Sequence, residues 1–298
     1  MLVGAAGSDK TGYLGRVYAF SGTSHKQLFY FDGVQPFDQV GTAVDSIPDV
    51  NGDGTPDVLV GAHGTDLPSA SNGFDSDVGV VHVLSGCDGS VLTRLHGLHE
   101  DQLFGISVGN LGDINGDGTE DFAVGTGPDV EGGCVLYSGR NLTRLYQFDR
   151  SCTPYSVNFG WVLHPAGDVT GDSLADWILT DSYSLAHGPL AGQTFAFAGN
   201  DLFLWPQSCK VKVGFPLTLH VAGGAASSPA AMFAVQFDGV PMSPPALLSI
   251  GALDSLSTWQ ETWTVPSILA GHSVGFIGFG IGVRGGIADT TIETVAFE

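Results

Sequence analysis

Basic side chains are scarce in this chain of 298 residues, where 10 lysines and arginines stand against 31 aspartates and glutamates, for a formal net charge of −21. The acidity is concentrated, because residues 1–206 hold 25 acidic and 7 basic side chains (25 − 7 = 18 negative) and residues 207–298 hold 6 and 3. Contact with nucleic-acid phosphates or anionic lipid surfaces needs clusters of Lys and Arg. We therefore expect no nucleic-acid partner.

Cysteine is also sparse, with four residues and no C-x-x-C spacing: Cys87, Cys134, Cys152 and Cys209. This spacing excludes the zinc and redox motifs that depend on closely paired cysteines. In an exported protein, four cysteines allow two disulfides in three connectivities. A free buried thiol is an equally good reading for Cys134, which lies in a predicted strand.

Long helical periodicities are missing as well. Short alternating apolar runs between Gly, Asn, Asp and Pro turns dominate instead, so the predicted class is all-β. One uncharged stretch, Thr262–Val283, is long enough to span a bilayer. Its Pro266, His272 and many glycines favour a pair of β-strands over a membrane span.

What the sequence does have is a recurring acidic nonapeptide. Asp113–Asp121 reads D-I-N-G-D-G-T-E-D, Asp49–Asp57 reads D-V-N-G-D-G-T-P-D, and Asp168–Asp176 reads D-V-T-G-D-S-L-A-D. Calcium prefers six to eight oxygen ligands, and a glycine-bent loop supplies them from alternate positions. The predicted ligands occupy positions 1, 3, 5, 7 (backbone carbonyl) and 9 of each loop: Asp49, Asn51, Asp53, Thr55 and Asp57; Asp113, Asn115, Asp117, Thr119 and Asp121; Asp168, Thr170, Asp172, Leu174 and Asp176.

The third loop is the weakest match, because Thr170 replaces Asn and Ser173 replaces a glycine. None of the loops is an EF-hand loop, which runs between helices to a Glu at position 12. In the second loop that position is Val124, inside an apolar run that predicts a buried strand. The sequence therefore predicts calcium-binding turns between β-strands, two of them matching well.

The loops belong to a longer repeat, since their starts lie 64 and 55 residues apart (49, 113 and 168). Each loop lies between a segment that begins with Phe and a short apolar strand, and two further strands follow. The predicted first strands are Phe37–Val44, Phe104–Val108 and Phe159–Leu163, and the predicted fourth strands are Val91–Leu95, Leu142–Phe148 and Leu202–Trp205. Four strands in a period of this length are typical of β-propeller blades.

These residues resemble FG-GAP repeats, the units of integrin α-subunit propellers and of many secreted bacterial proteins. The resemblance rests on Phe104-Gly105, Phe159-Gly160, the calcium loops and the Gly-Ala-Pro-like ends Val60–Ala62 and Val124–Pro128; Phe37-Asp38 departs from the Phe-Gly pair. It covers roughly residues 1–205. It implies a propeller segment, residues 1–206, with blades at about 1–34, 35–99, 100–152 and 153–206.

The first of these blades is predicted to be partial, which leaves three full blades. Met1–Ala6 matches the second strand of a blade, so that a first strand, its calcium loop and a signal peptide are not seen. We expect an open propeller edge, which closes as a four-bladed ring or is completed by self-association or by another chain. Calcium loops of this kind fill at extracellular calcium levels, so the expected location is extracellular or at the cell surface.

Residues 207–298 lose the acidic loops and gain Pro, Ser and Ala. We expect a small β-sandwich there, of six or seven strands: Lys210–Val213, Leu217–Val221, Met232–Phe237, Ala246–Ile250, Thr258–Val265, Val274–Ile281 and Ile292–Phe297.

A partner-binding face is predicted at the end of the blades opposite the metal loops. Long loops gather there, His63–Asp77 being the longest, with Phe74, Tyr155 and Tyr183 as candidate contacts. Tolerated surface loops explain the same lengths equally well. The expected function is a calcium-stabilised, non-catalytic binding or adhesion module that recognises a protein or a glycan.

Two alternatives remain open, a catalytic or accessory part of a secreted hydrolase and a truncated fragment of a longer FG-GAP protein. Apparent enzyme motifs lack their structural context. Gly105–Gly109 fits G-x-S-x-G but lies on a predicted strand, and Gly280–Gly285 fits G-x-G-x-x-G but precedes no helix.

Overall fold

A computed structural model of the protein describes all residues except 8–11, 69–73, 116, 128–132, 150–158, 170–174, 182–191, 198–202, 207–209, 212–215, 223–226, 254–257, 282–286, 290–292 and 298. The described residues form β-strands joined by turns, with a single turn of 3-10 helix, η2 (Ser267–Leu269). This confirms the predicted all-β class. No helix in the described part of the chain is long and apolar enough to cross a membrane.

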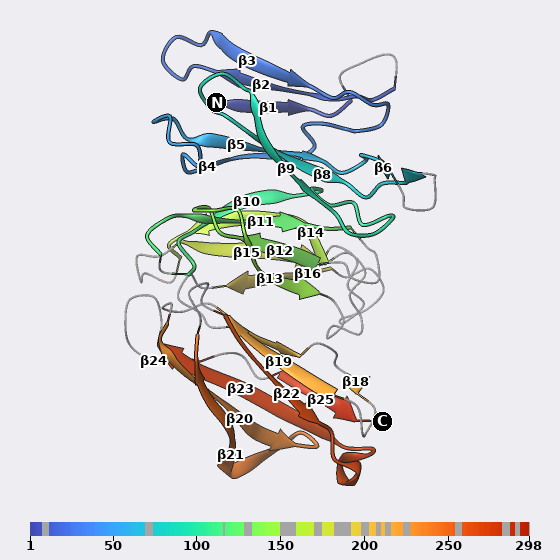
Figure 1. Cartoon of the computed structure of the whole chain (residues 1–298), viewed down its shortest axis with the longest axis vertical. Coiled ribbons are helices and arrows are strands. Elements are labelled where there is room, and N and C mark those ends of the chain that lie inside the picture. Colours follow the sequence, from blue (N-terminus) through green and yellow to red (C-terminus); the bar gives the residue numbers. More distant parts are fainter. Residues whose placement is uncertain are drawn as a thin grey trace.

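The first two-thirds of the chain folds into four antiparallel sheets, in which successive strands pair in chain order (Figure 1). The first sheet contains β1 (Leu2–Ala5), β2 (Arg16–Phe20) and β3 (Gln27–Asp32). The second contains β4 (Val44–Ile47), β5 (Asp57–Ala62), β8 (Val80–Leu84) and β9 (Val91–His96). Between β5 and β8 lies a small hairpin, β6 (Leu67–Pro68) and β7 (Phe74–Asp75).

The third sheet repeats the arrangement of the second with β10 (Val108–Gly112), β11 (Asp121–Gly125), β12 (Gly133–Tyr137) and β13 (Arg144–Asp149). The fourth contains β14 (Phe159–Gly167), β15 (Asp176–Asp181) and β16 (Gln193–Phe197). Two of these antiparallel meanders have four described strands and two have three, and successive strands pair in chain order as they do in propeller blades.

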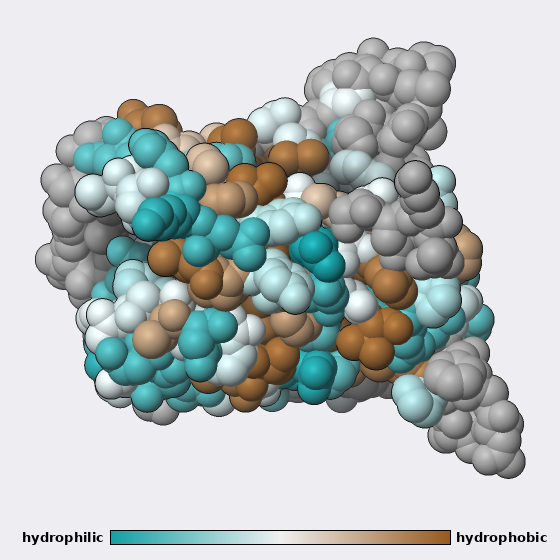
Figure 2. Space-filling model, turned by 90° about the horizontal axis from the view of Figure 1, so that it is seen from above, coloured by the Kyte–Doolittle hydropathy of each residue, from teal (hydrophilic) through white to brown (hydrophobic). Residues whose placement is uncertain are grey.

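Each sheet packs its face on the next one, so that three apolar layers lie between the four sheets. Val17 of the first sheet packs in one cluster with Val58 of the second, and Leu59 of the second packs with Phe122 of the third. A further cluster joins Leu136 of the third sheet to residues of the fourth. Figure 1 shows the first sheet at one end of this stack, and Figure 2 views that end, where apolar and polar residues alternate over the surface.

Glycines mark the places where successive sheets approach most closely. A Cβ built on Gly61 would lie 2.1 Å from the carbonyl oxygen of Gly105, and one on Gly125 would lie 2.2 Å from that of Gly160. Gly105 and Gly160 also have φ near +91°, a conformation that favours glycine. The two glycines of the repeat thus meet across a blade boundary, because each side lacks a Cβ.

The same contact corrects one detail of the sequence analysis. Gly4 approaches Gly41, which has φ +89°, so Gly41 is the equivalent of Gly105 and Gly160. The pair that corresponds to Phe-Gly in the first full blade is therefore Val40-Gly41, and not Phe37-Asp38. Val40 is fully buried whereas Phe37 is 57% exposed.

The remaining strands form two sheets over one core. The smaller sheet has the order β17-β19-β22 and the larger one the order β18-β25-β23-β20-β21, with β24 also paired to β23. Their bounds are β17 (Phe203–Pro206), β18 (Lys210–Val211), β19 (Pro216–Ala222), β20 (Pro229–Phe237), β21 (Val240–Ala252), β22 (Thr258–Thr264), β23 (Ser273–Ile281), β24 (Ile287–Asp289) and β25 (Glu293–Phe297). One buried cluster joins Leu219 of the smaller sheet to Met232 of the larger, which makes a β-sandwich.

Two strand pairings differ from the sequence analysis. The segment expected as the fourth strand of the last blade, Leu202–Trp205, forms β17 and pairs with β19 of the sandwich. The stretch Thr262–Val283 forms strands as expected, but β22 and β23 belong to different sheets and do not pair with each other. An apolar run predicts a strand but does not specify the partner of that strand, which depends on residues distant in sequence.

Candidate metal centre

The first acidic loop joins β4 to β5 and is held by hydrogen bonds from its own backbone. The Asp49 carboxylate accepts the N–H groups of Gly52 (2.7 Å) and Gly54 (2.6 Å). The N–H of Asp53 is shared by Asp49 Oδ1 (3.1 Å) and Asn51 Oδ1 (2.9 Å). Oxygens from positions 1 and 3 therefore converge on one point inside the turn.

Asp53 is tied to the same loop and to the neighbouring strand. Its Oδ2 accepts hydrogen bonds from the Asn51 side chain (2.9 Å) and from the Ser85 hydroxyl (3.0 Å). The bond from Asn51 is the main cause that lowers the pKa of Asp53, so this carboxylate is ionised at neutral pH. The N–H of Thr55 donates to Asp53 Oδ1 at 2.8 Å, which places position 7 next to position 5.

The second loop, between β10 and β11, repeats this geometry. The N–H of Asp117 is shared by Asp113 Oδ1 (3.0 Å) and Asn115 Oδ1 (2.9 Å), and Gly118 donates to Asp113 Oδ2 (2.8 Å). The N–H of Thr119 donates to Asp117 Oδ1 at 2.9 Å. Two loops that differ in flanking sequence thus arrange the same donor types in the same way.

Position 9 is buried in all three loops. Asp57 and Asp121 are fully buried and Asp176 is 1% exposed. Each accepts the N–H of position 2 of its loop, from Val50, Ile114 and Val169 respectively, at 2.8, 3.1 and 2.7 Å.

Burial raises the pKa of Asp121 to about 7, and the nearby charges of Asp117 and Asp113 add to the shift. Burial likewise raises the pKa of Asp57, with smaller contributions from Asp53 and Asp49. A carboxylate buried beside other carboxylates is stabilised in its charged form by a cation.

The sequence analysis missed the contribution of the turn that follows the third strand. The N–H groups of Gly86 and Gly139 donate to Oδ1 of Asp57 and Asp121, each at 3.1 Å. Arg140 approaches the second loop, donating to the Asp117 carbonyl oxygen at 2.7 Å. The recurrence of Ser-Gly after the third strands of the second and third sheets, at Ser85-Gly86 and Ser138-Gly139, was the available signal.

Of the third loop, Asp168 and Asp176 lie in the described part of the chain, whereas Thr170, Asp172 and Leu174 lie outside the described residues. The described residues contain no group of three or more His, Cys, Asp or Glu side chains arranged to hold a metal ion. The side chains at positions 1, 3 and 5 are instead hydrogen-bonded to backbone N–H groups of their own loop. The residue types at the predicted ligand positions suit a hard cation, because the side chains at positions 1, 3, 5 and 9 all carry oxygen atoms.

The chain is similar to integrin α chains over about half of its length. It is 32% identical to integrin alpha-PS2 of Drosophila melanogaster over 145 residues (43% of this chain, 10% of that one). It is 28% identical to integrin alpha-V of Gallus gallus over 177 residues (56% and 17%). These matches support the resemblance of the repeats in this chain to the FG-GAP repeats of integrin α chains.

The integrin-like repeats agree with the β-propeller reading of the stacked sheets. The chain is also 30% identical to phosphatidylinositol-glycan-specific phospholipase D of Bos taurus over 178 residues, 54% of this chain and 21% of that one. It thus spans between 10 and 21% of the length of these relatives. No family model matches the chain. A solved structure of Spo0M, a sporulation control protein from Bacillus subtilis, aligns with 33% of this chain and 49% of that chain, at 13% identity and a TM-score of 0.21, which is too low to show a shared fold.

Proposed function

We propose that this FG-GAP protein is a calcium-stabilised extracellular binding or adhesion module without catalytic activity of its own. The observation that supports it most is the repeated loop geometry, in which a buried position-9 carboxylate lies beside two less buried carboxylates of the same turn. The integrin α relatives support a binding role at the cell surface. Protein or glycan is the proposed ligand class.

In this proposal, Ca²⁺ is held by the side-chain oxygens of positions 1, 3, 5 and 9 and the carbonyl of position 7. When bound, the ion neutralises clustered carboxylates and fixes the turn between the first two strands of a blade. The first and second loops are the better sites and the third is the weaker one. The chain's own contribution is to preorder the turn, as the hydrogen bonds from Gly52 and Gly118 do.

The ligand face is proposed at the end of the blades opposite the metal loops. Tyr13, between β1 and β2, stacks on Phe37, between β3 and β4, with ring centroids 6.1 Å apart, and both side chains are 57% exposed. Val34 is 83% exposed in the same connection. Exposed aromatic side chains on loops of a rigid scaffold suit recognition of a protein or sugar surface. Tyr155 and Tyr183 lie outside the described residues, as does the Phe74 side chain.

We further propose a division into a propeller segment and a sandwich, with the boundary placed before β17 and not at 206/207, because β17 pairs with the sandwich strand β19. We also propose an association through the first sheet. In that sheet β1 pairs with β2 on one side. The other edge of β1 offers backbone N–H and C=O groups to a strand of another copy or of a partner chain. Light scattering across a concentration series tests this, since a constant monomer mass would argue against self-association.

Thermal unfolding with and without calcium tests the metal assignment. At a Ca²⁺ concentration about 100-fold above Kd, the ion should stabilise the protein by about 2.7 kcal/mol. For a chain of this size that raises Tm by roughly 5–10 °C relative to EDTA. Equal melting curves in calcium and EDTA would refute the assignment.

A matched pair of variants localises the effect. Asp117→Ala should remove part of the calcium-dependent rise in Tm, because position 5 of the second loop loses its carboxylate. Glu100→Ala removes the same charge from an exposed residue outside the loops, and its calcium response should equal that of the wild type.

A second candidate function, part of a secreted hydrolase, is favoured by the similarity to phosphatidylinositol-glycan-specific phospholipase D. An assay for release of a glycan-anchored protein from the membrane separates the two. Release by this chain in calcium, abolished by mutation of one carboxylate outside the loops, would favour the hydrolase.

A further inference from the structure

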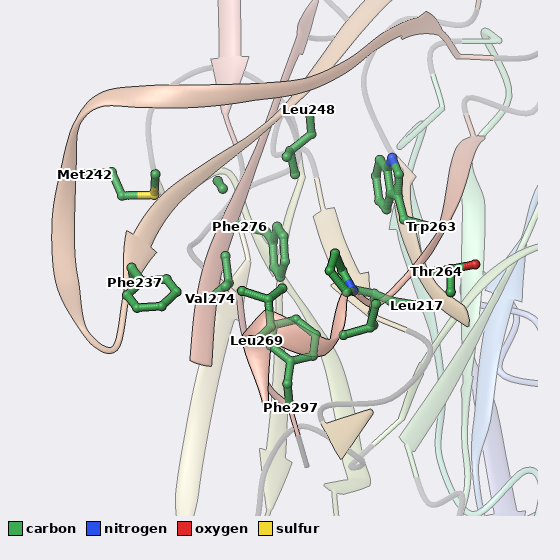
Figure 3. A pocket seen from close by; sticks show the side chains of 13 residues that line it. Leu217, Phe237, Met242, Leu248, Trp263, Thr264, Leu269, Val274, Phe276 and Phe297 are labelled. Atoms are coloured by element: carbon green, nitrogen blue, oxygen red, sulfur yellow. The ribbon is translucent and has the colours of Figure 1, made fainter. Parts of the chain in front are cut away.

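The core of the C-terminal sandwich is filled at one end and hollow at the other. Leu219, Met232 and Leu253 are buried by at least 98% and pack together at the filled end. At the other end the two sheets enclose a cavity of about 340 Å³, shown in Figure 3. The hollow results partly from Ala234, which presents only a methyl group where the strand faces the smaller sheet.

The walls of this cavity are apolar. The described lining residues carry no charge, and a hydroxyl group comes from Thr264 alone. Aromatic side chains surround the space in Figure 3, among them Phe276 and Phe297 on one side and Trp263 on the other. A sugar, an ion or a charged peptide placed there would bury polar groups with few hydrogen-bond partners, which is costly.

A β-bulge directs one of these aromatic rings into the cavity. In the pairing of β20 with β23, Ala234 lies opposite Phe276, Gln236 opposite Gly275 and Phe237 opposite Val274, so one extra residue is inserted in β20. Without the bulge, strict alternation from Ala234 would turn Gln236 toward the core. With it, Phe237 lines the cavity instead. Bulges re-aim side chains in this way beside functional sites.

The mouth of the cavity is identified by the lining residues that remain exposed. Phe237 is 38% and Leu248 is 37% exposed, whereas Val274 and Phe297 deeper in are 7% and 3% exposed. Near Leu248 on the same strand, Leu247 and Ile250 are 51% and 68% exposed. Beside the mouth, His272 Nδ1 and Asp238 Oδ2 lie at a hydrogen-bond distance of 2.7 Å, so polar and apolar groups meet at its edge.

We propose that this cavity binds the hydrocarbon chain of a free amphiphile, such as a medium-chain fatty acid, with the head group at the mouth. An apolar cavity of about 150 Å³ binds benzene, so one of about 340 Å³ holds a hydrocarbon of roughly ten to twelve carbon atoms. Met242 at the wall is an adaptable residue that can repack around such a chain. Filling the space restores the dispersion contacts that the hollow end of the core lacks.

Fluorescence titration with a dansyl-labelled undecanoic acid, followed by displacement with decanoic acid, tests the proposal on the full chain. We expect micromolar binding of the probe, displacement by decanoic acid and none by glucose. Titrations in calcium and in EDTA should agree, because the site is separate from the acidic loops. Failure of the metal assignment would thus leave this result unchanged.

Two variants fill the cavity from different sides. Ala234→Leu fills it from the core, and Met242→Trp fills it from the partly exposed hairpin, which tolerates a larger side chain more readily. Each should weaken probe binding at least tenfold. Ile250→Ser removes an exposed apolar side chain that does not line the cavity and should bind as the wild type does.

Three outcomes would overturn the proposal. One is the absence of saturable probe binding by the wild type. Another is equal binding by the wild type and both filled variants when circular dichroism shows that they are folded. The third is binding to phosphatidylcholine vesicles with no binding of decanoic acid, which would make a membrane surface the occupant.

Discussion

In the second and third sheets, the glycine of the turn that follows the third strand is required by the loop it touches. A Cβ on Gly86 would lie 1.8 Å from the carbonyl oxygen of Pro56, and one on Gly139 would lie 1.9 Å from that of Glu120. Since neither glycine has positive φ, the requirement is steric. Close approach lets both N–H groups reach the buried position-9 carboxylates.

Gly139→Ala should therefore destabilise the protein by roughly 1–3 kcal/mol, as overpacking against backbone does. Gly22 is a matched control, because it follows the third-strand position of the partial blade and a Cβ there would meet nothing within 4 Å. Urea unfolding measures both. A Gly139→Ala variant as stable as Gly22→Ala would contradict the steric account.

Protonation of the His82 side chain makes the stability of the folded protein depend on pH. His82 lies on β8 with its ring 4.9 Å from that of Phe31, and its Nδ1 is buried without a hydrogen-bond partner. Burial lowers the pKa of His82 to about 4, with smaller contributions from Arg94 and His96. The folded state therefore holds this ring neutral at pH values where the unfolded chain is protonated.

The sign of the pH effect follows from linkage. A histidine with a lowered pKa contributes stability that is fully present above the unfolded pKa of 6.5 and is lost as the pH falls toward about 4, by about 3 kcal/mol at most. The difference in unfolding free energy between wild type and His82→Leu should change over this range and be constant above pH 7. A constant difference from pH 4 to 8 would contradict the assignment.

At the scale of elements, the packing of successive sheets depends on large side chains between them. Trp177 on β15 is fully buried and stacks on Phe197 of β16, with ring centroids 4.2 Å apart and planes 16° apart. It belongs to the layer that also contains Leu111 and Leu136 of the third sheet. The third and fourth sheets are thus joined through this one indole ring and its neighbours.

Trp177→Ala should cost about 3–5 kcal/mol, because it leaves a large cavity in that layer. Trp177→Phe retains the ring stacking and should cost less. Thermal unfolding of both variants measures the difference. Similar stability of the Ala and Phe variants would show that the layer collapses around the smaller side chain.

At the scale of the whole molecule, self-repulsion accompanies the net charge of −21. Without divalent ions, raising NaCl from about 20 to 500 mM should raise Tm, because screening weakens repulsion between surface carboxylates. With calcium present the rise should be smaller, since bound ions would already offset part of the charge. A Tm that falls with salt in EDTA would contradict this.

The sequence by itself determined the strand content and the repeat. Oxygen donors alternating around glycines specify a tight turn, and the apolar runs after each loop specify buried strands, because both depend on neighbouring residues only. That is why the sequence places the loops Asp49–Asp57 and Asp113–Asp121 between the first two strands of their sheets, where the structure also has them. The resemblance of the repeats to FG-GAP units followed from the same local features.

The tertiary structure decided what depends on residues distant in sequence. It set the equivalence of Gly41 with Gly105, which requires the contact between two sheets. It also paired β17 with β19 of the sandwich, a partner that the local sequence of β17 does not specify. It also brought Phe237 to the wall of the cavity in the sandwich, through a bulge that the spacing of apolar residues does not reveal. Neighbouring residues decide turns and strands, whereas strand register and the space between sheets depend on contacts between residues that are distant in sequence.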